Sequence, residues 1–165
     1  KYSSLKSLFV MPRPADKMLT AGFYPLSSNK FNIQEYSFRV GALTIPTKNP
    51  NTSTEMFCEL MKSVGSIGDI NQQPSIDNTS YNQNYPVLSD ETLALTGIVS
   101  SGSFYIGLDL ENYSGASRST IFSGINTNTD DTYFYPTYGV NANAVTIRFD
   151  SFAMFDSVIV FKNNT

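Results

Sequence analysis

The sequence predicts an all-β protein: an antiparallel, eight-stranded jelly-roll sandwich with one short α-helix carried on a connection between strands. Three observations favour this class. Short apolar segments with the two-residue alternation of half-buried strands recur along the chain. Gly, Asn, Ser and Pro separate these segments at short intervals, as turns do in sandwiches. Only one segment has helical periodicity, and about eight strands suit a jelly roll better than an immunoglobulin-like sandwich.

The composition describes one polar but weakly charged domain. The 165 residues are enough for a single core, so residues 1–165 are predicted to form one jelly-roll domain. Charged residues make up 15% of the chain, against roughly 25% in ordinary soluble domains. The net charge of −3 and the absence of any basic run argue against direct nucleic-acid binding. No apolar run is long enough for a membrane span.

The first predicted strand is Ser4–Met11. We expect Pro12 and Pro14 to end it, because proline cannot donate to a strand ladder. The residues Ala15–Asn29 then read as a loop with scattered apolar anchors.

The second predicted strand is Tyr36–Val40, whose apolar and polar residues alternate. Gly41 follows, and glycine inside a strand usually marks a bulge or a close backbone approach. Leu43–Ile45 is expected to continue the extended run to Pro46. The residues expected on the buried face are Tyr36, Phe38 and Val40.

The residues 52–65 predict an amphipathic helix with a signal at each end. Thr52 can cap the first turn while Glu55 reaches back to the N–H of the cap, the reciprocal arrangement of a capping box. Gly65 suits the left-handed position that ends a helix. One apolar stripe follows the helical period, so this face must pack against the strands: Met56, Phe57, Leu60, Met61 and Val64. Cys58 is expected to flank the stripe as a small hydrophobe.

The residues after the helix form a long polar segment and then the remaining strands. We expect 66–86 to be an ordered surface loop pinned by Ile76, Tyr81 and Tyr85. The last apolar run, Val158–Phe161, is typical of a central strand buried on both faces. The predicted strands are Ala94–Val99, Gly102–Leu110, Tyr133–Tyr138, Ala144–Phe152 and Ala153–Phe161.

Catalytic chemistry has few candidate residues. Histidine is absent, which excludes His-based triads, Cys-His nucleophiles and His-ligated zinc. The only cysteine, Cys58, can form no internal disulfide and has no conventional activator. Asp109 and Glu111 could act as the paired acids of a glycoside hydrolase, but a polar strand end explains them better. No phosphate-binding glycine loop occurs, and the sequence predicts no catalytic, cofactor or metal site.

Two further segments have both a binding and a structural interpretation. The residues Asn126–Asp131 offer oxygen ligands for calcium, although an Asx-rich turn explains them equally well. Tyr133 and Tyr135 share one face of a strand and could stack on sugars, although a half-buried strand needs the same alternation for packing alone.

Three segments together resemble the double jelly-roll major capsid proteins of the virophage, Polinton-like and adenovirus hexon lineage. The first runs from the strand Tyr36–Gly41 through Pro46 into the capped helix. The second is Gly107–Glu111 followed by the turn Ser123–Thr127, which is similar to a late strand and serine-glycine turn of their C-terminal jelly roll. The third, Thr146–Asp150 with Phe155–Val160, is similar to their closing strands.

The resemblance implies a structural role rather than an enzyme. It implies that this chain, which begins at Lys1, is the C-terminal half of a longer chain with two jelly rolls. Three such chains would form a pseudo-hexameric capsomer of an icosahedral DNA-virus or virophage-like shell. The implied partners are other copies of the chain, joined through the upstream jelly roll, then neighbouring capsomers, penton proteins and minor capsid proteins. The implied location is the virion capsid, assembled inside the host cell, with no cofactor.

Two other functions fit the same composition. A carbohydrate-binding, lectin-like jelly roll would use Tyr and Asn side chains, with or without calcium. A polysaccharide-cleaving sandwich would use Asp109 and Glu111. Glycan binding that is lost on chelation would favour the lectin, whereas assembly into trimers when the chain is joined to an upstream jelly roll would favour the capsid protein.

Overall fold

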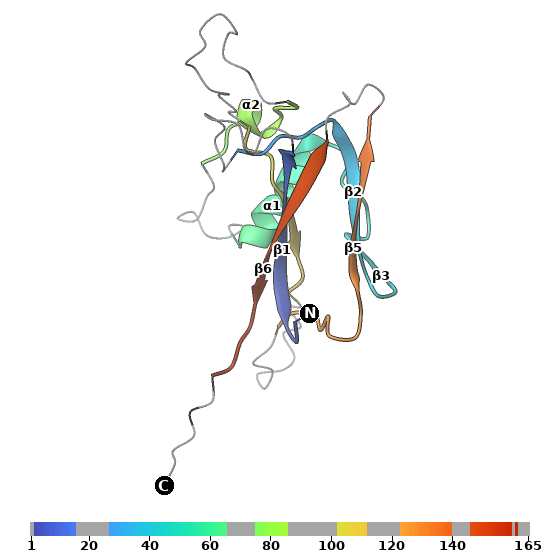
Figure 1. Cartoon of the computed structure of the whole chain (residues 1–165), viewed down its shortest axis with the longest axis vertical. Helices are drawn as coiled ribbons and strands as arrows, with labels where there is room; N and C mark the ends of the chain where they lie inside the picture. The colour runs from blue at the N-terminus through green and yellow to red at the C-terminus, as the bar shows by residue number, and fades with distance from the viewer. Residues whose placement is uncertain are drawn as a thin grey trace, which may run out of the picture.

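The computed structural model describes residues 2–15, 27–65, 75–85, 102–111, 123–139, 146–159 and 161. These residues form two antiparallel three-stranded sheets that face each other, with two short helices beside them (Figure 1). The predicted all-β sandwich is confirmed at this level, with six strands in the described part of the chain. The first sheet has the order β4 (Ile106–Asp109), β1 (Leu5–Pro14), β6 (Ile147–Phe155), and the second has the order β3 (Leu43–Ile45), β2 (Ile33–Val40), β5 (Thr132–Tyr138).

The core lies between the two sheets, where the strand alternation directs apolar side chains. Tyr36, Phe38 and Val40 of β2 are buried as predicted. Ile106 and Leu108 of β4 are buried in the same cluster. The rings of Phe134 on β5 and Phe149 on β6 meet edge to face with their centroids 5.3 Å apart, so the two sheets also touch at their β5 and β6 sides.

Strand β1 continues through both prolines, so the expected end at Met11 is wrong. Pro12 pairs with Phe149 and Pro14 with Ile147 of β6. The carbonyl of Pro12 points away from β6, where it accepts from the Asn29 N–H at 3.2 Å and the Ser28 hydroxyl at 2.9 Å. The pairing of β1 with β4 ends at Val10. In the described part of the chain, the N–H groups that Pro12 and Pro14 lack would therefore have had no neighbouring strand to bond.

The chain reverses at Gly41 instead of continuing extended, which also corrects the sequence prediction. Val40 pairs with Leu43, so β2 and β3 form a hairpin with a two-residue turn. Gly41 has φ of +58°, a conformation that glycine takes without steric cost. An added Cβ at this position would also lie 2.8 Å from the Asp130 carboxyl, a second reason for glycine here.

The capped helix is confirmed as α1 (Ser53–Val64). The Thr52 hydroxyl accepts from the Glu55 N–H at 3.2 Å, and Gly65 ends the helix with φ of +76°. The Glu55 carboxylate reaches one residue further back than expected, because it accepts from the Asn51 N–H at 3.0 Å. Its hydrogen bonds to Lys48 and Asn51 hold the pKa of Glu55 below the usual value.

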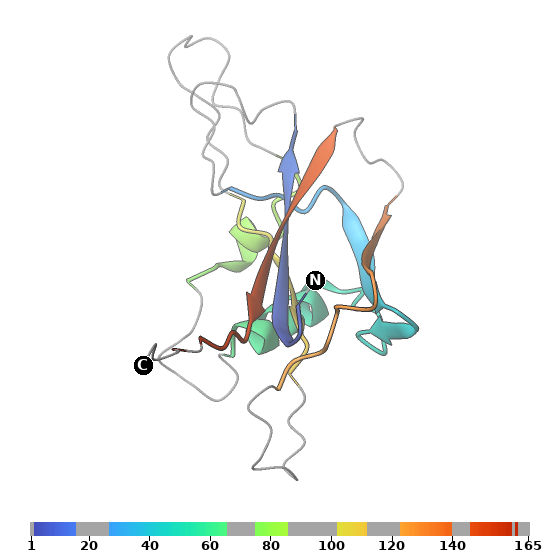
Figure 2. The same ribbon diagram turned by 60° about the horizontal axis from the view of Figure 1, so that its bottom comes forward.

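Helix α1 lies across β1 and β4 (Figure 2) and packs most closely on β4. Met56, Leu60 and Ser63 are its buried residues, so the buried face is rotated from the predicted stripe and leaves Val64 exposed. The close approach depends on Gly107. A Cβ at this position would lie 1.9 Å from the Ser63 hydroxyl and 2.9 Å from the Leu60 Cα.

The polar segment after α1 is pinned as predicted in its described part. Helix α2 (Asn78–Tyr81), which the sequence analysis missed, buries Tyr81 against the rings of Phe57 and Phe104. Ile76 packs against the core, and Tyr85 meets Phe31 edge to face. Neither helix of the described residues is long and apolar enough to cross a membrane.

The predicted strands near the end of the chain are only partly correct. The Gly102–Leu110 prediction shortens to β4, and Ala94–Val99 lies outside the described residues. In place of the two last predicted strands, Ala144–Phe152 and Ala153–Phe161, the structure has one continuous strand, β6, which spans Ile147–Phe155. The prediction of a buried central strand at the end is wrong, since Val158, Ile159 and Phe161 belong to no strand and are exposed.

Replacing Gly107 with alanine should lower the free energy of unfolding by about 1–3 kcal/mol, because the new methyl group overpacks the contact between α1 and β4. Urea denaturation followed by circular dichroism measures the change. Adding Ser63→Ala removes the atom nearest to the new methyl group, so the double variant should recover part of the loss. If Gly107→Ala lowers the free energy of unfolding equally with and without Ser63→Ala, this packing is contradicted.

Candidate functional site

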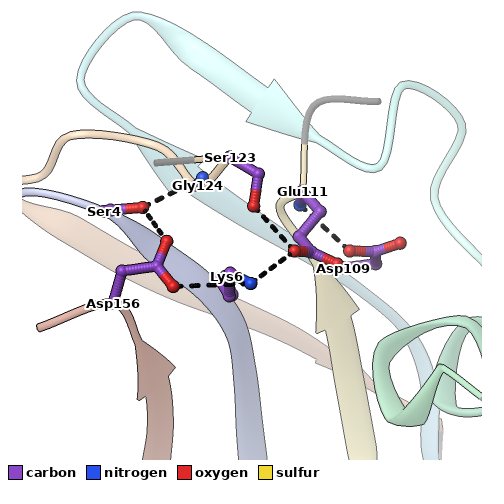
Figure 3. A network of polar contacts seen from close by, with 7 residues as sticks. All are labelled: Ser4, Lys6, Asp109, Glu111, Ser123, Gly124 and Asp156. Atoms are coloured by element: carbon purple, nitrogen blue, oxygen red, sulfur yellow. Dashed lines mark hydrogen bonds and ion pairs between the residues drawn. The ribbon is translucent and has the colours of Figure 1, made fainter. Parts of the chain in front are cut away.

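The two carboxylates at the end of β4 belong to a polar network that joins four distant segments (Figure 3). The Lys6 ammonium lies 2.9 Å from Glu111 Oε1 and 3.4 Å from Asp156 Oδ1. The Ser123 hydroxyl donates to the same Glu111 oxygen at 2.7 Å, and the Ser4 hydroxyl donates to Asp156 Oδ2 at 2.8 Å. We call Ser4, Lys6, Asp109, Glu111, Ser123, Gly124 and Asp156 the polar clasp.

Backbone hydrogen bonds place these side chains together. Leu5 and Ile125 exchange N–H donors at 2.9 Å, which holds the turn with Ser123 against the start of β1. The Leu110 N–H donates to the Lys6 carbonyl at 2.8 Å, and the Asp156 N–H donates to the Ser4 carbonyl at 3.0 Å. Gly124 allows the close contact, since a Cβ there would lie 2.4 Å from the Leu5 carbonyl oxygen.

Lys6 is the cation at the centre of the clasp. Its hydrogen bond to Glu111 raises the pKa of the ammonium, and the charge of Glu111 and the Asp156 carboxylate add to the effect against a smaller opposing effect of burial. About a third of the side chain is exposed. Solvent therefore screens these ion pairs, and we expect each to contribute in the range of surface pairs.

The contacts of the polar clasp give a structural role to Asp109 and Glu111, the two acids that a hydrolase would have used. Asp109 Oδ1 accepts from the Glu111 N–H at 3.0 Å, which is the local side-chain contact of an Asx turn. Glu111 is bound to Lys6 and Ser123. Sequence reasoning missed these partners, and no local signal could have found them, because they come from strands and turns far away in the sequence.

The segment Asn126–Asp131 has the geometry of an Asx-rich turn. Asn126 Oδ1 accepts from the Asn128 N–H at 2.9 Å, and the Thr129 hydroxyl bonds to Asp130 at 3.2 Å. Thr127 is buried and exchanges hydrogen bonds with the backbone of Tyr2. Within the described residues no group of three or more His, Cys, Asp or Glu side chains lies close enough to hold a metal ion.

Tyr133 and Tyr135 lie side by side on the outer face of β5, as the alternation predicted. Their ring centroids are 6.3 Å apart with an angle of 32° between the planes. The rings are 52% and 48% exposed, so they do not belong to the core. Phe134, between the two tyrosines on β5, packs against the core. Packing on the core therefore does not explain why Tyr133 and Tyr135 are tyrosines.

Cys58 does not flank the buried face of α1 as expected, because its side chain is exposed. The helix turns Met56 and Leu60 toward β4, and this rotation directs Cys58 to solvent.

Exposed apolar side chains concentrate on β6 and on the residues that follow it. Phe152 and Met154 are each 54% exposed on the outer face of β6. Beyond the strand, Ile159 is 75% exposed and Phe161 is 89% exposed. An apolar groove beside them is lined by Phe9, Leu60, Val64, Ile76, Tyr105 and Phe152. We call Phe152, Met154, Val158, Ile159 and Phe161 the β6 apolar surface.

Comparisons with protein-family models, curated proteins and solved structures find no match to this chain.

Replacing Lys6 with methionine should lower the free energy of unfolding near pH 7 by about 0.5–1 kcal/mol, the range of partly exposed ion pairs. Because the folded-state pKa of Lys6 is raised, its contribution is fully present below pH 10.5 and disappears as the pH rises through the folded-state value. The stabilities of wild type and variant should therefore converge above pH 10.5. Urea denaturation at a series of pH values measures this difference, and a constant difference up to the highest pH would contradict it.

Proposed function

We propose that this chain is a structural capsid protein: the jelly-roll module of a double jelly-roll major capsid protein that forms trimeric, pseudo-hexameric capsomers in the shell of a virion. The observation that carries the proposal is the β6 apolar surface. A protein that must associate with other copies of itself needs such a surface.

The order of strand pairing supports a jelly roll. Strand β1 pairs with β6, and β2 pairs with β5, so the first described strand pairs with the last and the second with the next to last. These two pairs belong to different sheets. A chain folded back on itself as a long double ribbon and then rolled into two sheets has this nested pairing. An eight-stranded jelly roll would need further strands beyond the six described.

The β6 apolar surface supports assembly for two reasons. Among the described residues β6 pairs with β1 alone and so forms one edge of its sheet, and an open edge can accept a strand from another chain. Val158, Ile159 and Phe161 belong to an apolar, β-branched stretch of sequence typical of a buried strand, yet these three residues are exposed. A sequence suited to burial but left in solvent indicates a contact that another chain completes.

The polar clasp holds the end of β6 in place. Asp156 is the last residue before the exposed segment, and Ser4 and Lys6 hold its carboxylate. The end of β6 is therefore held in a defined position on the sandwich, which a repeated assembly contact requires.

Sedimentation velocity over a range of protein concentrations tests the proposal. We expect reversible, concentration-dependent self-association through β6, and we expect Phe152→Ser with Ile159→Asp to weaken it by about tenfold or more, since both changes place polar groups in the apolar contact. The matched control is Leu43→Ser, at a residue 53% exposed on β3. A chain that stays monomeric at every concentration, or that associates equally well with all these substitutions, would contradict an assembly function.

A further inference from the structure

A polar pocket of about 630 Å³ opens at one end of the β2–β5 sheet. It is bounded by the start of β2, the start of α1, the residues after α2 and the end of β5. Its volume lies within the range of small-molecule sites, roughly 300–1,000 Å³. Five side-chain amides line it: Asn32, Gln34, Asn51, Asn82 and Asn84.

The backbone around this pocket is specialised. Phe31 and Asn32 have φ of +48° and +57°, and the Ile33 N–H donates to the Lys30 carbonyl at 3.0 Å, so a tight turn with two left-handed residues leads into β2. The pairing of β2 with β5 then shifts between Ile33 and Glu35, which leaves Gln34 as an extra residue at the pocket. Bulges of this kind redirect side chains and are frequent beside functional sites.

Gly139 leaves room for two of the pocket amides. A Cβ at this position would lie 2.5 Å from Gln34 Nε2 and 2.7 Å from Asn32 Nδ2. The backbone N–H of Gly139 also donates to the Asn32 carbonyl at 2.9 Å, which fixes the end of β5 against the turn.

The exposed tyrosines continue from the pocket along the same face of the sheet. Glu35 and Thr137 line the pocket and pair across the strands, Ser37 pairs with Tyr135, and Arg39 pairs with Tyr133. Directly opposite residues of an antiparallel pair share a face, and every second residue along a strand returns to it. The pocket, Tyr135 and Tyr133 therefore form one strip.

We propose that this strip binds a neutral oligosaccharide, with one end of the sugar chain in the amide pocket and further sugar rings on Tyr135 and Tyr133. A side-chain amide both donates and accepts hydrogen bonds, which matches a sugar hydroxyl that does the same. The flat, exposed rings offer apolar faces for the C–H faces of sugars.

The charges near the pocket favour a neutral ligand. The Lys30 ammonium is bound to the Ser53 hydroxyl at 2.7 Å, and the Glu35 carboxylate accepts from the Asn49 amide. Among the described residues that line the pocket there are thus one cation and one carboxylate, each with a partner inside the protein.

An array of immobilised neutral and acidic oligosaccharides, probed with the labelled chain, tests the proposal. We expect binding to neutral oligosaccharides, with the affinity lowered by about tenfold or more in Tyr135→Ala, since the ring loses its apolar contact with the sugar. Gly139→Ala should lower it as well, because the added methyl group displaces the Asn32 and Gln34 amides. Leu43→Ala is the matched control: it removes an exposed apolar side chain, 53% exposed against 48% for Tyr135, from β3 outside the strip and should bind like the wild type.

Backbone NMR shifts of the labelled chain, titrated with the neutral oligosaccharide that gives the strongest array signal, locate the contact. Changes at Glu35, Ser37, Tyr135 and Thr137 are expected. Circular dichroism of each variant separates loss of binding from loss of folding. Binding to no neutral oligosaccharide, binding to acidic ones alone, or binding unchanged in both Tyr135→Ala and Gly139→Ala would overturn the proposal. These outcomes are separate from those of the sedimentation experiment, which depends on β6.

Discussion

The pairing of β1 with its two neighbours is the interaction on which the rest of the structure depends. Strand β1 is the central strand of its sheet, and it joins the beginning of the chain to β4 and to β6 near the end. Such long-range pairings close large loops, so the chain entropy they cost must be offset by the core that they enclose. The polar clasp lies where β1 begins, β4 ends and β6 ends, and it fixes the register of all three by hydrogen bonds and ion pairs.

The sequence predicted well the elements whose signals are local. The caps of α1 at Thr52 and Gly65 lie within a few residues of the turns they satisfy, and the alternation in β2 reports which side chains face the core. The errors arise where the neighbouring strand decides the outcome. Pro12 and Pro14 remain in β1 because β4 no longer pairs there, and that absence of a partner leaves no mark on the local sequence.

For the candidate sites, too, the sequence predicted local features correctly and missed the partners that come from distant segments. The alternation correctly put Tyr133 and Tyr135 on one face, but it could not tell whether that face was inside or outside the sandwich. The partners of Glu111 and the lining of the amide pocket come from segments that only the tertiary fold brings together. At Val158 the local sequence predicted a buried strand, but the residue is exposed and lies outside β6, because a strand-like sequence does not supply its own neighbour.

The two proposed binding surfaces lie on opposite outer faces of the sandwich. Phe134 and Phe149 face each other between the sheets, so their neighbours along β5 and β6 must point outward on opposite sides. Tyr133 and Tyr135 thus belong to the outside of one sheet, and Phe152 belongs to the outside of the other. A contact that covers β6 leaves the tyrosine strip open. Assembly and oligosaccharide binding are therefore compatible in one molecule, since neither surface has to be released for the other to be occupied.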